Sequence, residues 1–198
     1  MLDLLKKTSV LDVLVGERIL NFTGYISQLC FSEFTEILCL NEDLQEVYIP
    51  ISQVKIGTLV KSYNHGYRKV SVIYKDKITN NINNFESCMF VMHKEKDMTK
   101  DLIVTGGHSI LVDDMTEDEH NKNMKYFKNY VQKIENKVLL LAAASDKFKA
   151  LENNNEYITY NFALENDGDN KARYGVWANG VLVETPSIQY LKEDLFGK

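Results

Sequence analysis

Three cysteines and four histidines are the residues of this 198-residue chain that could carry nucleophilic or metal chemistry. The cysteines are odd in number and share no repeated spacing, which argues against a disulfide framework and favours a reducing, intracellular compartment. No CxxC pair is present and the histidines lie far apart, so the sequence predicts no metal site and no cofactor. The thiol of Cys30 lies between Leu29 and Phe31, an apolar setting that also suits an inert buried group.

The elements that would position these residues are mostly strands. Short runs rich in Val, Ile, Tyr and Phe alternate with turn residues and predict a soluble, all-β domain. An Asn-His-Gly turn at 64–66 separates two of these runs. The first twenty residues fit a helix face as well as a buried strand. The expected strand runs are 47–51, 58–63, 68–74, 87–91, 101–104, 109–112, 137–141, 157–165 and 174–184.

One helix is expected within this β pattern. Thr116 and Glu119 have the spacing of a capping box, which marks a helix start. Apolar residues then follow at helical spacing, at Met124, Phe127, Val131 and Ile134. The sequence therefore predicts an inserted amphipathic helix, within about 114–136, that packs against the strands.

Composition excludes several classes of protein. The net charge is −5 with the basic residues scattered, whereas a nucleic-acid binder needs a basic face, so no nucleic-acid partner is expected. No stretch reaches the ~20 apolar residues of a membrane span, and acidic residues interrupt the apolar run near the start, which argues against a signal peptide. With 44% hydrophobic residues, the chain can bury a core.

Three segments, taken in order, resemble the Hint domain, the self-processing fold of hedgehog proteins and inteins. The first is CFSEFTEI at 30–37 followed by ISQVKIGTLV at 51–60; the second is DLIVTGGHSILV at 101–112, which contains a TxxH pattern; the third is YGVWANGVLVET at 174–185. Each segment alone is weakly specific, but their order is specific. The three segments most resemble those of the Hint domains encoded by large double-stranded DNA viruses. This resemblance implies a viral origin and a location in the host cytoplasm or a virion.

This resemblance implies a fold and a domain organisation. The fold is a pseudo-twofold, all-β Hint (hedgehog/intein-like) fold with one inserted helix. Residues 30–190 form the domain, residues 1–29 a leader that packs back on the fold as an added strand or helix, and residues 191–198 a tail.

The resemblance also implies a reaction. The thiol of Cys30 attacks the carbonyl of Leu29 and exchanges the amide for a thioester, which is the more reactive acyl donor. His108 protonates the departing nitrogen, and Thr105 orients the scissile peptide. The enzyme would be a single-turnover, autocatalytic one whose substrate is its own N-terminal segment.

Two further positions complete the expected site. The backbone N–H groups of Gly106 and Gly107 are expected to stabilise the oxyanion, because glycine permits close approach. Asn161 stands where the family often has Asp, His or Cys.

Departures from the family pattern leave two alternatives open. The segment Val183-Glu184-Thr185-Pro186 lacks the terminal asparagine that splicing needs, so cleavage without splicing is expected. Phe34 replaces a turn glycine, and Asn161 cannot transfer protons. The alternative is therefore a degenerate Hint fold that serves as a structural or protein-interaction module, for example in virion assembly. A cysteine hydrolase acting on other proteins ranks last, because no protease signature is present.

Overall fold

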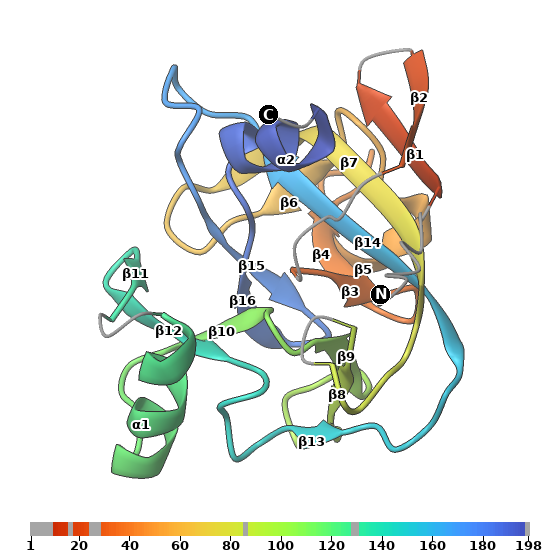
Figure 1. The fold of residues 1–198 in the computed structure, drawn as a ribbon. Coiled ribbons are helices and arrows are strands. Elements are labelled where there is room, and N and C mark those ends of the chain that lie inside the picture. Colours follow the sequence, from red (N-terminus) through yellow and green to blue (C-terminus); the bar gives the residue numbers. More distant parts are fainter. Residues whose placement is uncertain (1–9, 16–17, 24–28, 85–86, 128–130, 197–198) are drawn as a thin grey trace.

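A computed structural model describes residues 10–15, 18–23, 29–84, 87–127 and 131–196 of the chain. Within these residues the fold is almost entirely antiparallel β-sheet, with two α-helices and one short 3-10 helix (Figure 1). The predicted all-β class is confirmed. Neither of the helices in these ranges is long and apolar enough to cross a membrane.

The elements follow one another as a series of short strands. The strands are β1 (Val10–Val15), β2 (Arg18–Thr23), β3 (Phe31–Ser32), β4 (Glu36–Leu40), β5 (Glu46–Pro50), β6 (Leu59–Lys61), β7 (Tyr67–Thr79), β8 (Met89–Met92), β9 (Leu102–Thr105), β10 (Ser109–Val112), β11 (Lys133–Ile134), β12 (Lys137–Leu141), β13 (Lys149–Ala150), β14 (Glu156–Leu164), β15 (Gly175–Ala178) and β16 (Val181–Glu184). The helices are η1 (Ile51–Gln53), α1 (Glu117–Tyr126) and α2 (Ile188–Phe196).

Strand β7 joins the two parts of the sheet. Its first residues, Tyr67 to Lys69, pair with β6, and from Val70 to Thr79 it pairs with β14. The same strand also pairs with β1 through Ile73 to Lys75. The segment that fitted both helix and strand therefore forms a β-hairpin, β1–β2, which adds to the sheet. The other residues of the expected leader lie outside the described ranges, except Leu29.

The core is built from the strands, several of which, such as β10, β12 and β14, bury consecutive residues, whereas β4 alternates buried and half-buried ones. The largest fully buried side chains include Phe31, Phe162, Leu102 and Leu140. Burying a side chain of this size contributes about 1.5–3 kcal/mol. Because Phe31 belongs to β3 and stacks on Phe162 of β14, with ring centroids 6.1 Å apart, the short β3 is anchored firmly in the main cluster.

The helix α1 begins where the sequence predicts and ends earlier. The capping box is confirmed, since Thr116 Oγ1 accepts the Glu119 N–H at 3.2 Å and Glu119 accepts the Thr116 N–H at 3.1 Å. The predicted extension to Ile134 is wrong, because Ile134 lies in β11 and pairs with Lys137 of β12. Glu135 and Asn136 both have positive φ, the geometry of a tight hairpin turn, so strand pairing wins over the helical pattern.

A buried amide ties α1 to the sheet. Asn123 donates its Nδ2–H to the Leu139 carbonyl at 2.9 Å, and its Oδ1 accepts the Leu141 N–H at 3.0 Å. The apolar residues Met124 and Phe127 are only half-buried. Polar contacts therefore contribute to the attachment of α1 to β12.

The helix α2 runs through the boundary at residue 190 that the sequence suggests. It crosses β7 and β14 at one end of the molecule (Figure 1), and Leu191 is fully buried there. Part of the expected C-terminal tail is thus a packed element of the fold.

Candidate functional site

The strand register brings three distant segments to Cys30. In β3, Phe31 pairs with Tyr160 of β14 on one side and with Val104 of β9 on the other. Because antiparallel partners run in opposite directions, the residue before Phe31 must lie beside Asn161 and Thr105. The start of β3 is therefore the point where the chemistry-bearing residues meet.

Thr105 holds the nitrogen side of the Leu29–Cys30 peptide. Its Oγ1 accepts the Cys30 N–H at 2.9 Å, and its own backbone N–H donates to the Cys30 carbonyl at 3.0 Å. The residue is almost fully buried. Thr105 thus touches the nitrogen that would leave if this peptide bond were cleaved.

Asn161 holds the carbonyl side of the same bond. Its Nδ2–H donates to the carbonyl oxygen of Leu29, while its Oδ1 accepts the Phe162 N–H at 2.9 Å and so fixes the amide orientation. An N–H donor aimed at a carbonyl oxygen polarises that carbonyl and would stabilise negative charge developing on it. Sequence reasoning placed Asn161 in the site as a residue unable to transfer protons; in the structure its side chain donates to the Leu29 carbonyl oxygen.

The thiol of Cys30 is buried among apolar groups. Burial raises its pKa to about 12, the negative charge of Asp76 adds to the rise, and a hydrogen bond with the Thr159 side chain opposes it. At neutral pH a thiol with this pKa is ionised in about one molecule in 10⁵. The Cys30 thiol is therefore almost entirely protonated at neutral pH.

His108 lies against Phe31, in the same buried region. The two rings have centroids 4.2 Å apart, and neither imidazole nitrogen has a hydrogen-bond partner among the described residues. Burial and, to a smaller extent, the positive charge of Arg173 together lower the His108 pKa to about 3. The imidazole is neutral at neutral pH, so it must accept a proton before it can donate one.

Of the two glycines, Gly106 has hydrogen bonds that differ from the expected ones. Gly106 donates its N–H to the Cys88 carbonyl at 3.1 Å and accepts the Ala143 N–H at 3.1 Å. This N–H therefore does not point at the Leu29 oxygen, and the oxyanion role expected for Gly106 has no support in the geometry. For Gly107 the same role stays a prediction.

Phe34 does not distort the turn that follows Cys30. The turn is closed by the Thr35 N–H, which donates to the Ser32 carbonyl at 3.1 Å. Phe34 has no positive φ and its ring is 56% exposed, so this turn needs no glycine.

A half-buried ion pair lies beside His108. Glu184 is almost fully buried, pairs with Arg173, and accepts the N–H of Ser109 at 3.0 Å. Arg173 also donates to Gln132 at 3.0 Å. The pair fixes the backbone just after His108 and places a cation near the imidazole.

Sequence reasoning missed Thr159, Asp76 and this ion pair. Thr159 could have been found, because it lies two residues from Asn161 on a strand and shares its face. Asp76 stands between two lysines and gives no such signal. Among the described residues, no cluster of three or more His, Cys, Asp or Glu side chains could hold a metal ion.

Comparisons with known proteins were made with both the sequence and the structure. No protein-family model and no curated protein matches the chain. Among solved structures, the chain is similar to a bacterial intein-like domain from Clostridium thermocellum, at 18% identity over 80% of this chain and 100% of that one, with a TM-score of 0.47. It is also similar to the TvoVMA intein, at 13% identity over 78% and 96%, with a TM-score of 0.45.

Proposed function

We propose that this chain is a Hint-type self-processing domain that cleaves its own Leu29–Cys30 peptide bond without splicing. The observation that carries this proposal is that two side chains hydrogen-bond to the two ends of one peptide bond. Asn161 donates to its carbonyl oxygen and Thr105 accepts from its N–H, directly beside the only thiol that adjoins the bond. An ordinary buried peptide needs hydrogen bonds, but it does not need a thiol next to an amide donor.

The reaction is an N-to-S acyl shift. A bond forms between Cys30 Sγ and the carbonyl carbon of Leu29, the bond from that carbon to the Cys30 nitrogen breaks, and the thiol proton ends on the nitrogen. His108 is neutral and has an unprotonated ring nitrogen for that proton, but its pKa of about 3 against about 12 for the thiol means that this transfer requires the site to open first. Water or an added nucleophile then cleaves the thioester, which leaves Leu29 as a carboxylate or an acyl product.

The segment that follows β16 is consistent with cleavage that is not followed by splicing. Splicing would need a residue after β16 that cyclises and releases the chain. Thr185 instead hydrogen-bonds to Tyr174 through both its backbone N–H, at 2.8 Å, and its hydroxyl, at 3.2 Å. Together with the ion pair of Glu184, these contacts hold the segment after β16 in place and give it a structural role.

One observation favours the alternative, a degenerate fold kept for structure or binding. The Cys30 thiol has a pKa of about 12 and lies under α2, so the form described here is a resting one. A scaffold without activity would tolerate this indefinitely. Self-cleavage at Leu29–Cys30 requires that the thiol become more exposed to solvent before it attacks.

The test is intact mass of the full chain followed over days at neutral pH, with and without a strong thiol. We expect a fragment Cys30–Lys198 that forms faster with added thiol and is absent from the Cys30→Ala variant. Cys39→Ala is the matched control, since Cys39 is another buried thiol with a raised pKa and is not next to Leu29. An unchanged mass in protein that remains folded would leave the scaffold alternative.

A further inference from the structure

The thiol of Cys30 has two apolar walls of different kinds. One wall is the sheet, formed by Val72 and Tyr74 of β7 and Ala163 of β14. The other wall is α2, whose Ile188 and Leu191 belong to the same cluster. Cys30 is 6% exposed and Leu191 is fully buried, so docked α2 leaves the sulfur little access to solvent.

The sheet wall cannot move without breaking the ladder that defines the fold. Strands β7 and β14 pair continuously from Glu156 opposite Thr79 to Ala163 opposite Val72. Opening this wall would also displace β3, which pairs with β14 and carries Phe31 into the main core. This wall is therefore the permanent one.

The helical wall is attached in a different way. The chain is fixed at Thr185 by its hydrogen bonds to Tyr174, and Pro186 follows before the helix starts. Beyond this point the helix joins no strand ladder; its Gln189 N–H donates to a loop carbonyl, that of Asn170, at 2.9 Å. Side-chain packing of Ile188 and Leu191 against β7 and β14 contributes to the attachment of α2, and none of the strand ladders includes the helix.

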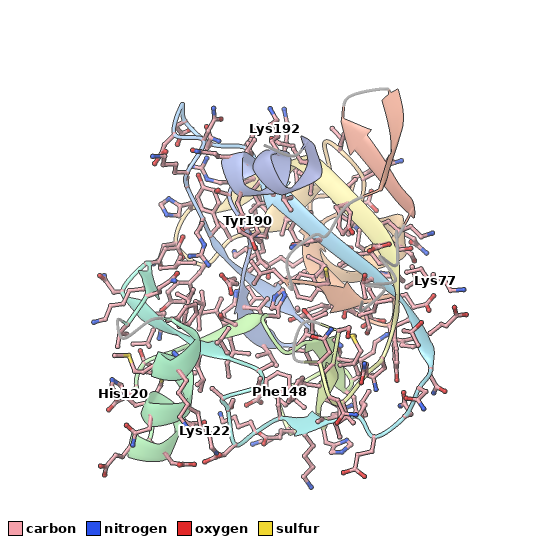
Figure 2. All side chains as sticks on the ribbon, viewed as in Figure 1. Lys77, His120, Lys122, Phe148, Tyr190 and Lys192 are labelled. Atoms are coloured by element: carbon pink, nitrogen blue, oxygen red, sulfur yellow. The ribbon has the colours of Figure 1, made fainter. Side chains whose placement is uncertain are left out.

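The orientation of α2 agrees with this division. Tyr190 lies on the side of the helix that faces the strands and Lys192 on the outer side (Figure 2). Tyr190 is half-buried against the Cys30 cluster, whereas Lys192 is exposed. Of the α2 side chains that the structure describes, Ile188 and Leu191 therefore cover the Cys30 thiol and Lys192 faces outward.

We propose that α2 is an autoinhibitory strap: docked on β7 and β14 it shields the thiol of Cys30, and its release admits solvent and reagents to that thiol. The consequence for cleavage rests on the proposed self-processing function, whereas the shielding itself does not. Release would bring water to the sulfur and remove the largest cause of its raised pKa, which is burial. The strap would thus control access to the same peptide bond that Thr105 and Asn161 hold by hydrogen bonds.

The other two cysteines provide internal controls within the same molecule. Cys39 is as buried as Cys30, and burial raises its pKa to about 12 as well, but it belongs to the main core and not to the α2 cluster. Cys88 is also free and buried. A reagent that labels thiols therefore reports α2 release at Cys30 and global unfolding at all three positions.

The experiment is iodoacetamide labelling of the full chain at neutral pH, with each cysteine quantified by peptide mass mapping. The Leu191→Ala variant is expected to raise the Cys30 labelling rate at least tenfold relative to Cys39. The milder Ile188→Ala variant should give a smaller rise of the same kind. Leu139→Ala, in a separate cluster of the core, is the matched control and should leave the Cys30-to-Cys39 ratio unchanged.

Two results would overturn the strap. One is an unchanged Cys30-to-Cys39 ratio in both α2 variants, and the other is a parallel rise at all three cysteines, which would mean that α2 opens only with the whole fold. Cleavage is read separately by intact mass. Selective labelling without any cleavage would keep the strap and reject self-processing.

Discussion

Replacement of Asn161 by alanine tests whether its side-chain amide has a catalytic role or only a structural one. The change removes the donor to the Leu29 carbonyl oxygen and also the acceptor of the Phe162 N–H at 2.9 Å. The first loss should slow attack on Leu29, because negative charge on that oxygen would have no side-chain donor. The second loss should lower stability, because a buried N–H is left without a partner.

The loss of transition-state stabilisation and the loss of unfolding free energy have different sizes. Loss of one oxyanion donor costs about 2.7–4 kcal/mol of transition-state stabilisation, which is about 10²–10³ in rate. An orphaned buried N–H costs about 1–3 kcal/mol of unfolding free energy. We therefore expect Asn161→Ala to cleave at least about a hundredfold more slowly than the parent chain while it remains folded.

The control is Asn123→Ala. Asn123 is also fully buried and, like Asn161, donates to one backbone carbonyl and accepts one backbone N–H. Its partners lie in β12, so its loss should lower the urea midpoint to a similar extent and leave the cleavage rate within a few-fold. Both variants are assayed by the rate of appearance of Cys30–Lys198 and by urea unfolding.

Equal cleavage rates for the two variants would refute the oxyanion role of Asn161. In that case the amide would serve only to satisfy backbone groups, and the geometry at Leu29 would carry no catalytic meaning.

Three further predictions concern other parts of the site. Because the His108 pKa is lowered to about 3 in the folded chain and is near 6.5 in the unfolded one, stability is full above pH 6.5 and is lost as the pH falls toward 3. This should amount to about 2 kcal/mol between pH 8 and pH 5 by urea unfolding, and His108→Leu should lose that pH dependence; an unchanged slope would contradict the buried neutral imidazole. Glu184→Gln should cost about 1–3 kcal/mol of unfolding free energy, between the values for surface and for buried pairs, because Glu184 is buried and the Arg173 side chain is 28% exposed; a loss below about 1 kcal/mol would mean that the pair behaves as a surface one. Thr105→Val should slow cleavage about tenfold or more, since the Cys30 N–H loses its acceptor, and a rate equal to the parent would remove Thr105 from the mechanism.

The fold class followed from the sequence because short runs of β-branched, aromatic and other apolar residues, separated by turn residues, are a local signal. Strands such as β10, β12 and β14 lie within one or two residues of their expected positions. The helix length did not follow, since the Ile134 that extends the helical stripe is taken by the β11–β12 hairpin. Local periodicity could not show which of two local structures tertiary pairing would select.

The site was predictable only in part. The sequence order suggests Cys30, Thr105 and His108 as members, and the structure brings Cys30 and Thr105 into hydrogen-bond contact. The donor to Leu29 depends on the register of β3 against β14, which no local pattern encodes. The cover by α2 depends on a short helix whose two buried residues, Ile188 and Leu191, have meaning only beside β7 and β14. The catalytic roles, the viral origin and the intracellular location stay predictions.

The chemical state of the released N-terminal segment tests the central claim most directly. The full chain is incubated with a strong thiol, or with hydroxylamine, and the mass of the fragment that ends at Leu29 is measured. Attack by Cys30 on the Leu29 carbonyl predicts a fragment whose C-terminus is a thioester of the added thiol, or a hydroxamate with hydroxylamine, and no such fragment from Cys30→Ala. A fragment that carries only a free carboxylate in excess hydroxylamine, which outcompetes water for a thioester, or a fragment that also forms in Cys30→Ala, would contradict an acyl transfer through this thiol.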